Sequence, residues 1–383
     1  MKYKLGELVT AISGYAFKRK QFSENGDIPV IKIKNIESPK IMVDSNTNRI
    51  SKSLFEKLIR YHVKQNDILI SLTGSHIEQI GSMVGKVGMY DQKEPAILNQ
   101  RVAKLCVKST NKLDPTYFYY WILRKEVQRL LASQAAGTAN QANISVNDIY
   151  ELEIELPSLE NQIIISNRIK KLDRNIQLNN QINDNLDALL TNIFKKYMIN
   201  DDFEKSNLTQ IANYKNGLAM QKYRPNSNEE SLPVLKIKEL NQGNTDDSSD
   251  RCSANLDNSV IVNTGDIIFS WSGTLLVKNW TGDKVGLNQH LFKVTSNKYP
   301  AWFIYEWTKY HLLRFQAIAA GKATTMGHIK RSDLKSSPVY IPSQLFLEKM
   351  DSQLAPIYSQ RLNLIKENQQ LSKLKQTLLN KYF

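Results

Sequence analysis

The sequence is poor in cysteine and has no long apolar run. Its cysteines are Cys106 and Cys252 alone, which excludes a disulfide scaffold and a zinc site of four cysteines. No stretch of about 18 apolar residues is present, which excludes a transmembrane helix. The N-terminal residues Met-Lys-Tyr-Lys-Leu-Gly-Glu-Leu lack the apolar core of a secretory signal. These absences predict a soluble protein located in the cytoplasm.

The usual catalytic motifs are absent as well. No Gly-x-Gly-x-x-Gly motif follows a predicted strand, and no Gly-x-x-x-x-Gly-Lys-Ser/Thr motif occurs. The histidines do not show the His-x-x-x-His spacing of a metallopeptidase. Asp114-Pro-Thr-Tyr resembles the acidic Pro-Pro-Tyr motif of methyltransferases, but it lacks the second proline and stands where a helix begins. We expect no catalytic residue, no metal site and no enzymatic activity in this chain.

Negative charge is in the minority. The sequence has 51 Lys and Arg against 37 Asp and Glu, a net charge of +14 over 383 residues. The excess is divided between both halves of the chain and is not collected in a tail. It favours an anionic partner, with nucleic acid first and a membrane surface second. The length fits two domains better than one.

The chain repeats itself, because five blocks of the first half return in the second half in the same order. The paired blocks are 5–17 with 208–220, 28–36 with 232–240, 66–74 with 265–273, 98–104 with 287–293, and 144–157 with 329–342. Chance similarity in one block is common, but five blocks in order indicate a duplication. We therefore predict two copies of one domain, related by a pseudo-twofold axis.

Each copy has the same predicted elements. Residues 29–36 alternate as a half-buried strand should, and Asp67 and Asp266 each precede a short apolar strand. Both aspartates are expected to cap backbone N–H groups in a turn. Residues 115–136 and 300–320 show the spacing of a helix. The pattern predicts an α+β fold with a mainly β core in each copy.

Each copy ends in one long helix with a serine N-cap. In the second helix Met350, Ile357, Leu364, Leu371 and Leu378 recur every seven residues, which is typical of helices that supercoil together. We expect the two helices to form an antiparallel coiled coil that separates the globular domains. Asn179, Asn183 and Asn368 are expected in its seam. The predicted segments are a first globular domain, 1–157; a first helix, 158–199; a second globular domain, 200–342; and a second helix, 343–383.

With these motifs the sequence resembles the specificity subunit of type I restriction-modification enzymes over its whole length. The resemblance rests on the tandem organisation, on the Gly-Asp-Ile strand with its Ser-x-x-Gly turn, on the Asn-Gln block, and on the Gly-rich loop before the heptad helix. It implies two target-recognition domains, each reading one part of a split sequence in double-stranded DNA. It also implies docking of modification (methyltransferase) subunits, two in number, and of restriction subunits through them. S-adenosylmethionine, ATP and magnesium are then expected in those partners, and no cofactor in this chain.

Basic residues near the predicted turns and strands are the candidates for phosphate contacts. Most of them occur at matching positions of both copies. They are Lys18, Arg19, Lys20, Lys32, Lys34, Lys222, Arg224, Lys236, Lys238, Lys322, Lys330 and Arg331. Solvated lysines that contact nothing are the alternative reading for Lys32, Lys34, Lys236 and Lys238.

Polar residues that differ between the copies are the candidates for reading bases. Gln79 has the side chain to bind adenine, and Lys278 has the side chain to bind guanine. The full set is Ser75, His76, Gln79, Asn140, Gln141, Asn143, Thr274, Lys278, Thr324 and Thr325. Trp271 and Trp280, which lie nearby, are expected in the core.

Two other functions remain open at this point. A stand-alone regulator that reads a split operator would also bind DNA, but it would need no methyltransferase partner. A scaffold that bridges two proteins would explain the helices but not the two basic halves.

Overall fold

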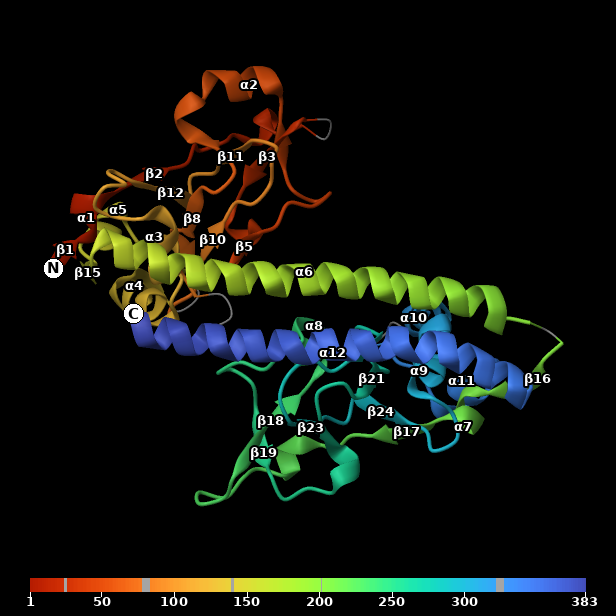
Figure 1. The fold of residues 1–383 in the computed structure, drawn as a ribbon. Coiled ribbons are helices and arrows are strands. Elements are labelled where there is room, and N and C mark those ends of the chain that lie inside the picture. The colour runs from red at the N-terminus through yellow and green to blue at the C-terminus, as the bar shows by residue number, and fades with distance from the viewer. Residues whose placement is uncertain (24–25, 78–82, 139–140, 201, 322–326) are drawn as a thin grey trace. The chain divides into compact units, whose positions relative to one another are not determined.

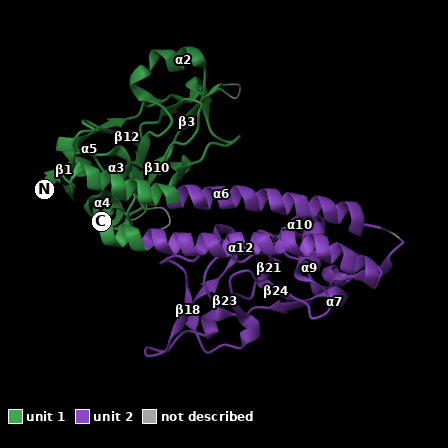
Figure 2. Ribbon diagram, in the orientation of Figure 1, with its two compact units in different colours: residues 1–171, 377–383 green, residues 172–376 purple. Residues whose placement is uncertain are grey.

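The computed structural model of the chain describes residues 1–23, 26–77, 83–138, 141–200, 202–321 and 327–383. These residues form two compact units (Figure 2). The first unit consists of residues 1–171 and 377–383, and the second of residues 172–376. No helix among the described residues is long and apolar enough to cross a membrane.

The first unit is built around two sheets. The larger sheet has the strand order β2-β12-β8-β10-β5-β4, and the second sheet has the order β6-β3-β11-β7. Two small sheets, β13-β14-β9 and β1-β15, complete it. The strands are β1 (Lys2–Lys4), β2 (Val9–Ser13), β3 (Ile28–Ile31), β4 (Ile36–Glu37), β5 (Lys40–Ile41), β6 (Arg49–Ile50), β7 (His62–Val63), β8 (Ile68–Ser71), β9 (Thr73–Gly74), β10 (Val87–Met89), β11 (Ala96–Leu98), β12 (Val102–Val107), β13 (Ala136–Thr138), β14 (Gln141–Asn143) and β15 (Glu153–Glu155).

The second unit repeats this topology. Its main sheets have the orders β17-β24-β21-β22 and β19-β18-β23-β20, with the pair β16-β25 beside them. The parallel pair β3-β11 returns as the parallel pair β18-β23. The strands are β16 (Glu204–Asn207), β17 (Asn213–Asn216), β18 (Ser231–Leu235), β19 (Arg251–Ser253), β20 (Ile261–Val262), β21 (Ile267–Ser270), β22 (Leu276–Asn279), β23 (Val285–Leu287), β24 (Leu291–Thr295) and β25 (Pro338–Ile341). The predicted duplication of one mainly β domain is confirmed.

The central strand of each unit lies between two apolar cores. In β8, Ile68 and Ile70 join one core while Leu69 joins the other. In β21, Phe269 and Ile268 are divided in the same way. Because successive side chains of a strand point to opposite faces, a strand buried on both faces must be apolar throughout. This burial explains the short uninterrupted apolar runs that follow Asp67 and Asp266.

The shorter helices pack in different cores around these sheets. In the first unit they are α1 (Leu5–Leu8), α2 (Lys52–Lys57), α3 (Pro115–Ile122), α4 (Lys125–Gln134) and α5 (Val146–Tyr150). In the second unit they are α7 (Leu208–Ile211), α8 (Ile237–Gln242), α9 (Ala301–Tyr310), α10 (Leu312–Ala320) and α11 (Arg331–Lys335). Each predicted helix of about 20 residues is therefore broken in two, and the prediction of one continuous helix is wrong.

The two breaks have local causes. Arg124 is extended, and its Nε donates to the Trp121 carbonyl at 3.2 Å, which ends α3. His311 is buried, and its Nε2 lies 2.8 Å from the Pro338 carbonyl oxygen, which fixes the chain between α9 and α10. Burial lowers the pKa of His311, while this hydrogen bond opposes the shift.

The predicted strand 29–36 is also wrong, because β3 ends at Ile31 and is buried on both faces. Residues 33–35 form a 3-10 turn, in which the Asn35 side chain accepts a hydrogen bond from the Lys32 N–H at 3.0 Å. In the second unit Glu239 accepts from the Lys236 N–H at 3.2 Å and begins α8. The side chain three residues after each lysine thus turns the chain out of the sheet.

The two long helices are α6 (Leu159–Met198) and α12 (Gln344–Tyr382), which run side by side in Figure 1. Within the second unit three polar pairs join them, and as the residue number rises by seven on α6 it falls by seven on α12. The pairs are Asp173 with Lys375 at 2.6 Å, Asn180 with Asn368 at 2.9 Å, and Asp187 with Arg361 at 2.7 Å. The helices are therefore antiparallel, as predicted, with a period of seven residues.

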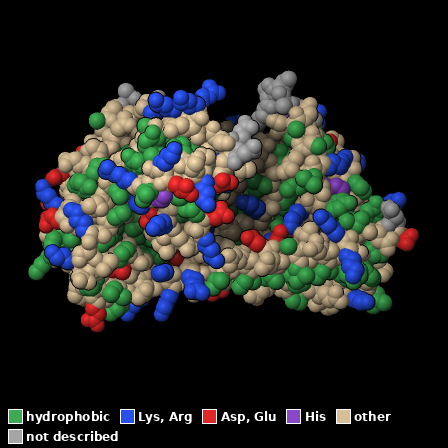
Figure 3. Space-filling view, turned by 90° about the horizontal axis from the view of Figure 1, so that it is seen from above, with side chains coloured by type: hydrophobic (Ala, Val, Ile, Leu, Met, Phe, Trp, Pro, Cys, Tyr) green, Lys and Arg blue, Asp and Glu red, His purple; other side chains and the backbone are tan. Residues whose placement is uncertain are grey.

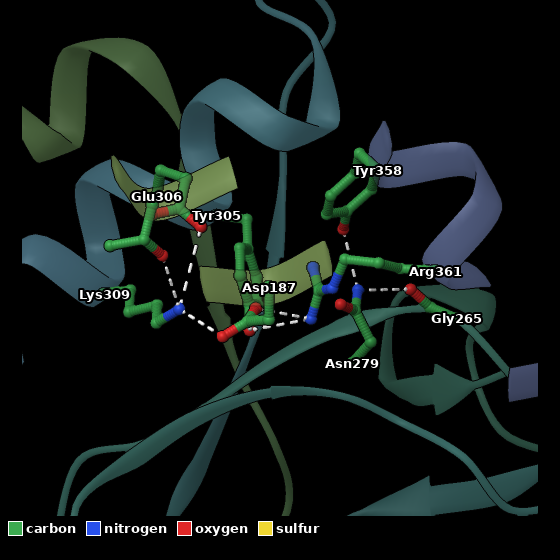
Figure 4. Close-up of polar contacts among 9 residues, drawn as sticks. Asp187, Gly265, Asn279, Tyr305, Glu306, Lys309, Tyr358 and Arg361 are labelled. Carbon is green, nitrogen blue, oxygen red and sulfur yellow. Dashed lines mark hydrogen bonds and ion pairs between the residues drawn. The ribbon is translucent and has the colours of Figure 1, made fainter. Parts of the chain in front are cut away.

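A partly buried ion network joins α6, α9 and α12 inside the second unit (Figure 4). The Asp187 carboxylate receives the Lys309 ammonium at 2.5 Å and the Arg361 guanidinium at 2.7 Å. Arg361 is 7% exposed and lies over the Tyr305 ring, 4.9 Å from its centroid. Glu306 is almost fully buried on α9, and Lys309 lies 3.8 Å from its carboxylate. Both cations thus share the Asp187 carboxylate, and Lys309 also lies beside Glu306.

Burial raises the pKa of Glu306 from 4.5 to about 7. The positive charge of Lys309 lowers this pKa and so only partly offsets the rise. The native state therefore holds this proton more tightly than the unfolded state, so the free energy of unfolding falls as pH rises from 4.5 to 7. The variant Glu306→Gln should be more stable than wild type by about 3 kcal/mol above pH 7 and no more stable below pH 4.5. Urea unfolding at pH 5 and pH 8 measures this, with the exposed Glu367→Gln on α12 as the control. An equal shift at both pH values would contradict it.

Candidate nucleic-acid interface

The turn before the central strand is built by an aspartate in each unit. Asp67 accepts from the Lys64 N–H at 2.8 Å, and Asp266 accepts from the Asn263 N–H at 2.8 Å. A lysine of the neighbouring strand completes each turn, with Lys104 3.3 Å from Asp67. In the second unit Lys293 is 2.8 Å from Asp266. The two recurring aspartates are capping residues, as predicted from the sequence.

The Asn-Gln block forms a tight loop between β11 and β12, and between β23 and β24. Gly14 and Gly217 each face the loop so closely that a Cβ would lie 2.2 Å from the carbonyl oxygen of Asn99 or Asn288. Only glycine permits this approach, which explains the glycine that recurs in the first block. The loop is thus held in the same way in both units.

A basic recess lies beside this loop in the first unit, where β8 ends. It has a volume of about 520 Å³, and its lining includes Lys34, Lys86, Arg101, Ser75 and Gln141. No carboxylate lines it among the described residues. A recess with cations and hydroxyl or amide groups suits an anionic or acceptor-rich ligand.

Two groups of predicted phosphate contacts are free and exposed. Lys18 precedes a 3-10 turn that contains Arg19 and Lys20, and all three side chains are exposed. In the second unit Lys222 and Arg224 are exposed at the corresponding place. Among the residues that the structure describes, none of these five side chains has a hydrogen-bond or ion-pair partner.

The predicted lysine pairs are engaged with their own units. The Lys32 ammonium donates to Asn48 Oδ1 at 2.8 Å, and burial and then Lys34 lower its pKa. Lys34 donates to the Asn46 carbonyl at 3.0 Å. Lys236 pairs with Asp250, and Lys238 lies 3.5 Å from Asp246. The two lysines of each pair do not share a strand face, because β3 ends at Ile31 and β18 ends at Leu235, before the lysines. All four lysines remain candidates for contacts with DNA.

The last predicted phosphate contacts surround the start of α11. Lys330 is exposed and its N–H donates to Asp333 at 2.7 Å. Arg331 donates to the Tyr214 carbonyl at 3.2 Å and lies over the Phe292 ring. Lys322 lies outside the described residues.

The predicted base-reading residues are spread over several environments. Ser75 is buried, His76 is half-buried, and Thr274 is exposed after β21. Gln141 and Asn143 are exposed on β14, where Asn143 accepts from the Thr73 hydroxyl at 2.7 Å. The residues outside the described part of the chain are Gln79, Asn140, Thr324 and Thr325.

Lys278 lies on a strand and not in a turn. It pairs with Ile268 in the β21-β22 ladder, and its ammonium donates to the Asn241 carbonyl at 3.1 Å. Burial lowers its pKa. In the second unit β22 therefore begins shortly after the Ser-x-x-Gly turn.

Trp280 is fully buried, as predicted, whereas Trp271 is partly buried and its indole N–H donates to Asn216 at 3.0 Å.

Sequence reasoning missed Lys86, Arg101 and His290. Arg101 and His290 follow the Asn-Gln pair of the two units. Within the blocks 98–104 and 287–293 they are the one pair of matching positions at which a charged residue is replaced, which is a signal that the sequence contains. Lys86 stands where the second unit has Leu276, a correspondence that needs the strand pairing. No group of His, Cys, Asp and Glu in the described residues is arranged to hold a metal ion.

Positive charge is distributed and not concentrated. On the face drawn in Figure 3, Lys and Arg side chains are scattered over the surface, with fewer Asp and Glu among them. This distribution agrees with the excess of basic residues in both halves of the sequence.

Comparison with known proteins gives the family. The model of the type I restriction modification DNA specificity domain matches residues 1–188 and again residues 200–373. The chain is 25% identical over 390 aligned residues to the type I restriction enzyme MjaIX specificity subunit of Methanocaldococcus jannaschii, covering 93% of this chain and 86% of that protein. It is 31% identical over 176 residues to the MjaVIII specificity subunit of the same organism, covering 46% of this chain but only 40% of that protein.

The fold has a counterpart among solved structures. The crystal structure of the type I restriction-modification system S subunit from M. genitalium aligns with a TM-score of 0.54 and 18% identity, covering 100% of this chain and 96% of that one. Together with the two family matches, this places both units in one fold. The chain belongs to the family of type I restriction modification DNA specificity domains and contains two of them in tandem.

Proposed function

We propose that this chain is the DNA-recognition subunit of a type I restriction-modification complex. Each unit reads one half-site of a bipartite target in double-stranded DNA. The observation that carries the proposal is that two specificity domains share one topology but differ in the side chains that their loops present. One scaffold with two different surfaces is what a split, asymmetric sequence requires.

The chain itself supplies recognition and not chemistry. Asp114, in the only sequence that resembles a methyltransferase motif, accepts from the Tyr117 N–H at 2.7 Å and thereby caps α3. Methyl transfer and DNA cleavage then belong to modification and restriction subunits, which would hold S-adenosylmethionine, ATP and magnesium.

The helix pair is the proposed docking site for the modification subunits. In the second unit Leu178, Ile182 and Leu189 of α6 are 44–46% exposed and share one face at helical spacing. An apolar face on a helix that is already paired suits a further helix from a partner.

Co-expression with a modification subunit tests the function. We expect a stable complex that methylates DNA at a split target, whereas the chain purified alone should methylate none. The variant Leu178→Glu with Ile182→Glu should lose the partner and keep DNA binding. A chain that binds a split site but retains no modification subunit would instead be a stand-alone regulator.

Removal of the free basic group is expected to weaken binding to every DNA sequence. For each phosphate that Lys18, Arg19 or Lys20 neutralises, glutamine at that position should reduce the slope of log affinity against log salt by about 0.9. Titrations of the triple glutamine variant from low to moderate salt measure this slope. The control is the triple glutamine variant of Lys52, Lys57 and Arg60, which are exposed in the same unit. Weaker binding to one sequence only would show that the group reads bases.

A further inference from the structure

We infer that Arg101 and His290 are equivalent base-reading residues of the two units, Arg101 taking a guanine and His290 making a weaker, single contact in the other half-site. This inference rests on the proposed function and adds to it two residues on which the choice of target depends.

The two side chains leave the same point of the same scaffold. The Arg101 carbonyl accepts from the Leu72 N–H at 2.9 Å, and the His290 carbonyl accepts from the Trp271 N–H at 3.3 Å. The first residue of the next strand is held in the same way in both units, by a hydrogen bond from the Val102 N–H to the Asn99 carbonyl and from the Leu291 N–H to the Asn288 carbonyl. The backbone is therefore common to both units, and only the side chain differs.

In the first unit this side chain is available to a ligand. Arg101 is exposed and lines the basic recess together with Lys34 and Lys86. Its guanidinium has no hydrogen-bond or ion-pair partner among the described residues. No carboxylate of the described residues lines the recess, so none of these residues supplies a charged acceptor to the fork of N–H donors.

In the second unit the equivalent side chain, His290, already contacts neighbouring residues of its own unit. His290 Nδ1 lies 3.0 Å from the Ser272 hydroxyl, and the ring packs 5.8 Å from that of Trp271. Its Nε2 lies 3.3 Å from the Gln289 amide nitrogen, so a contact between this nitrogen and a base would replace that interaction. Such a ring offers one hydrogen bond to a base edge, where arginine offers two.

This difference in chemistry favours reading of bases over contact with phosphate. Phosphates are alike in every sequence, so a phosphate contact gives no reason for two units to differ at one point of a common loop. The major-groove edge of guanine presents O6 and N7 as paired acceptors, which match the arginine fork. The first half-site should therefore contain a guanine on which binding depends.

The test uses the full chain with its co-expressed modification subunits and a DNA library in which both half-sites are randomised. Arg101→Lys keeps the charge but removes the fork, and it should reduce the preference for one guanine of one half-site by about 5- to 100-fold. The salt slope and the other half-site should stay unchanged. His290→Ala should change the other half-site only. Arg60→Lys, at an exposed arginine of the same unit outside the recess, is the control.

Three results would overturn the inference. They are unaltered base preferences in Arg101→Lys, uniformly weaker binding with a smaller salt slope, and an effect of His290→Ala on the half-site that depends on Arg101. In each of these the wild-type complex still selects a split target. A wild-type complex that selects no target would instead refute the proposed function.

Discussion

Replacement of Asp187 by alanine is expected to destabilise the second unit by about 3 kcal/mol. The change leaves Arg361, which is 7% exposed, and Lys309 without their shared carboxylate. A buried cation without its partner costs about 3–5 kcal/mol, and the lower end applies because the Asp187 side chain is itself 28% exposed. In a unit of this size the loss of stability corresponds to a fall in Tm of roughly 6–12 °C.

Tryptophan fluorescence during thermal unfolding measures this effect directly. Trp302 and Trp307 lie on α9, the helix that carries Lys309, and both are buried. The control is Asp184→Ala, an exposed residue one turn earlier on α6, which should change the stability by less than about 0.5 kcal/mol. Equal midpoints for the two variants would mean that Asp187 does not hold the cations.

The second large effect is expected from a matched deletion in the two long helices. Removing residues 174–180 from α6 and 368–374 from α12 takes one heptad from each and preserves the pairing of Asp173 with Lys375 and of Asp187 with Arg361. A deletion that included Asp187 would destroy the ion network as well. Seven residues correspond to about 10 Å of helix, or about three base pairs. If the helices set the spacing, the gap in the split target should shorten by about that number.

Selection of randomised DNA by the purified deletion variant decides this point, because this measurement needs no modification subunit and the deletion removes Leu178 from the proposed docking face. Both half-sites should remain readable with a shorter gap. Deletion from α6 alone is the matched control, because it keeps the heptad phase but cannot preserve both Asp173 with Lys375 and Asp187 with Arg361, and it should reduce stability. An unchanged gap in the matched variant would show that the helices do not set the spacing, and altered half-sites would show that they belong to the recognition surfaces.

The tandem fold was predictable because its signals repeat. Each of the five blocks occurs in both halves of the chain, and the apolar heptad position of α12 recurs five times. The prediction that Asp67 caps a turn is supported because Asp266 stands at the matching place in the second half. The end of β3 was missed although Asn35 and Glu239 stand three residues after the matching lysines, which is a capping spacing. The hydrophobic alternation of residues 29–36 predicts a longer strand, but these polar side chains turn the chain out of the sheet.

The candidate site was less predictable, because it depends on which loops meet. Arg101 was visible as a difference from His290, but only the fold brings it beside Lys34 and Ser75. The ion network of Asp187, Lys309 and Arg361 joins three helices far apart in the sequence, and nothing local to any of them predicts it.

The first unit is assembled from both ends of the chain, which has a consequence for its synthesis. Leu378, Leu379, Tyr382 and Phe383 pack against its core, and the Phe383 ring lies 4.8 Å from that of Tyr117. The second unit, in contrast, is one continuous segment. A ribosome that adds about 5–20 residues per second needs roughly 10–40 s to make that segment. During this interval the nascent first unit has no C-terminal helix to cover part of its core, so the domain that begins first is completed last.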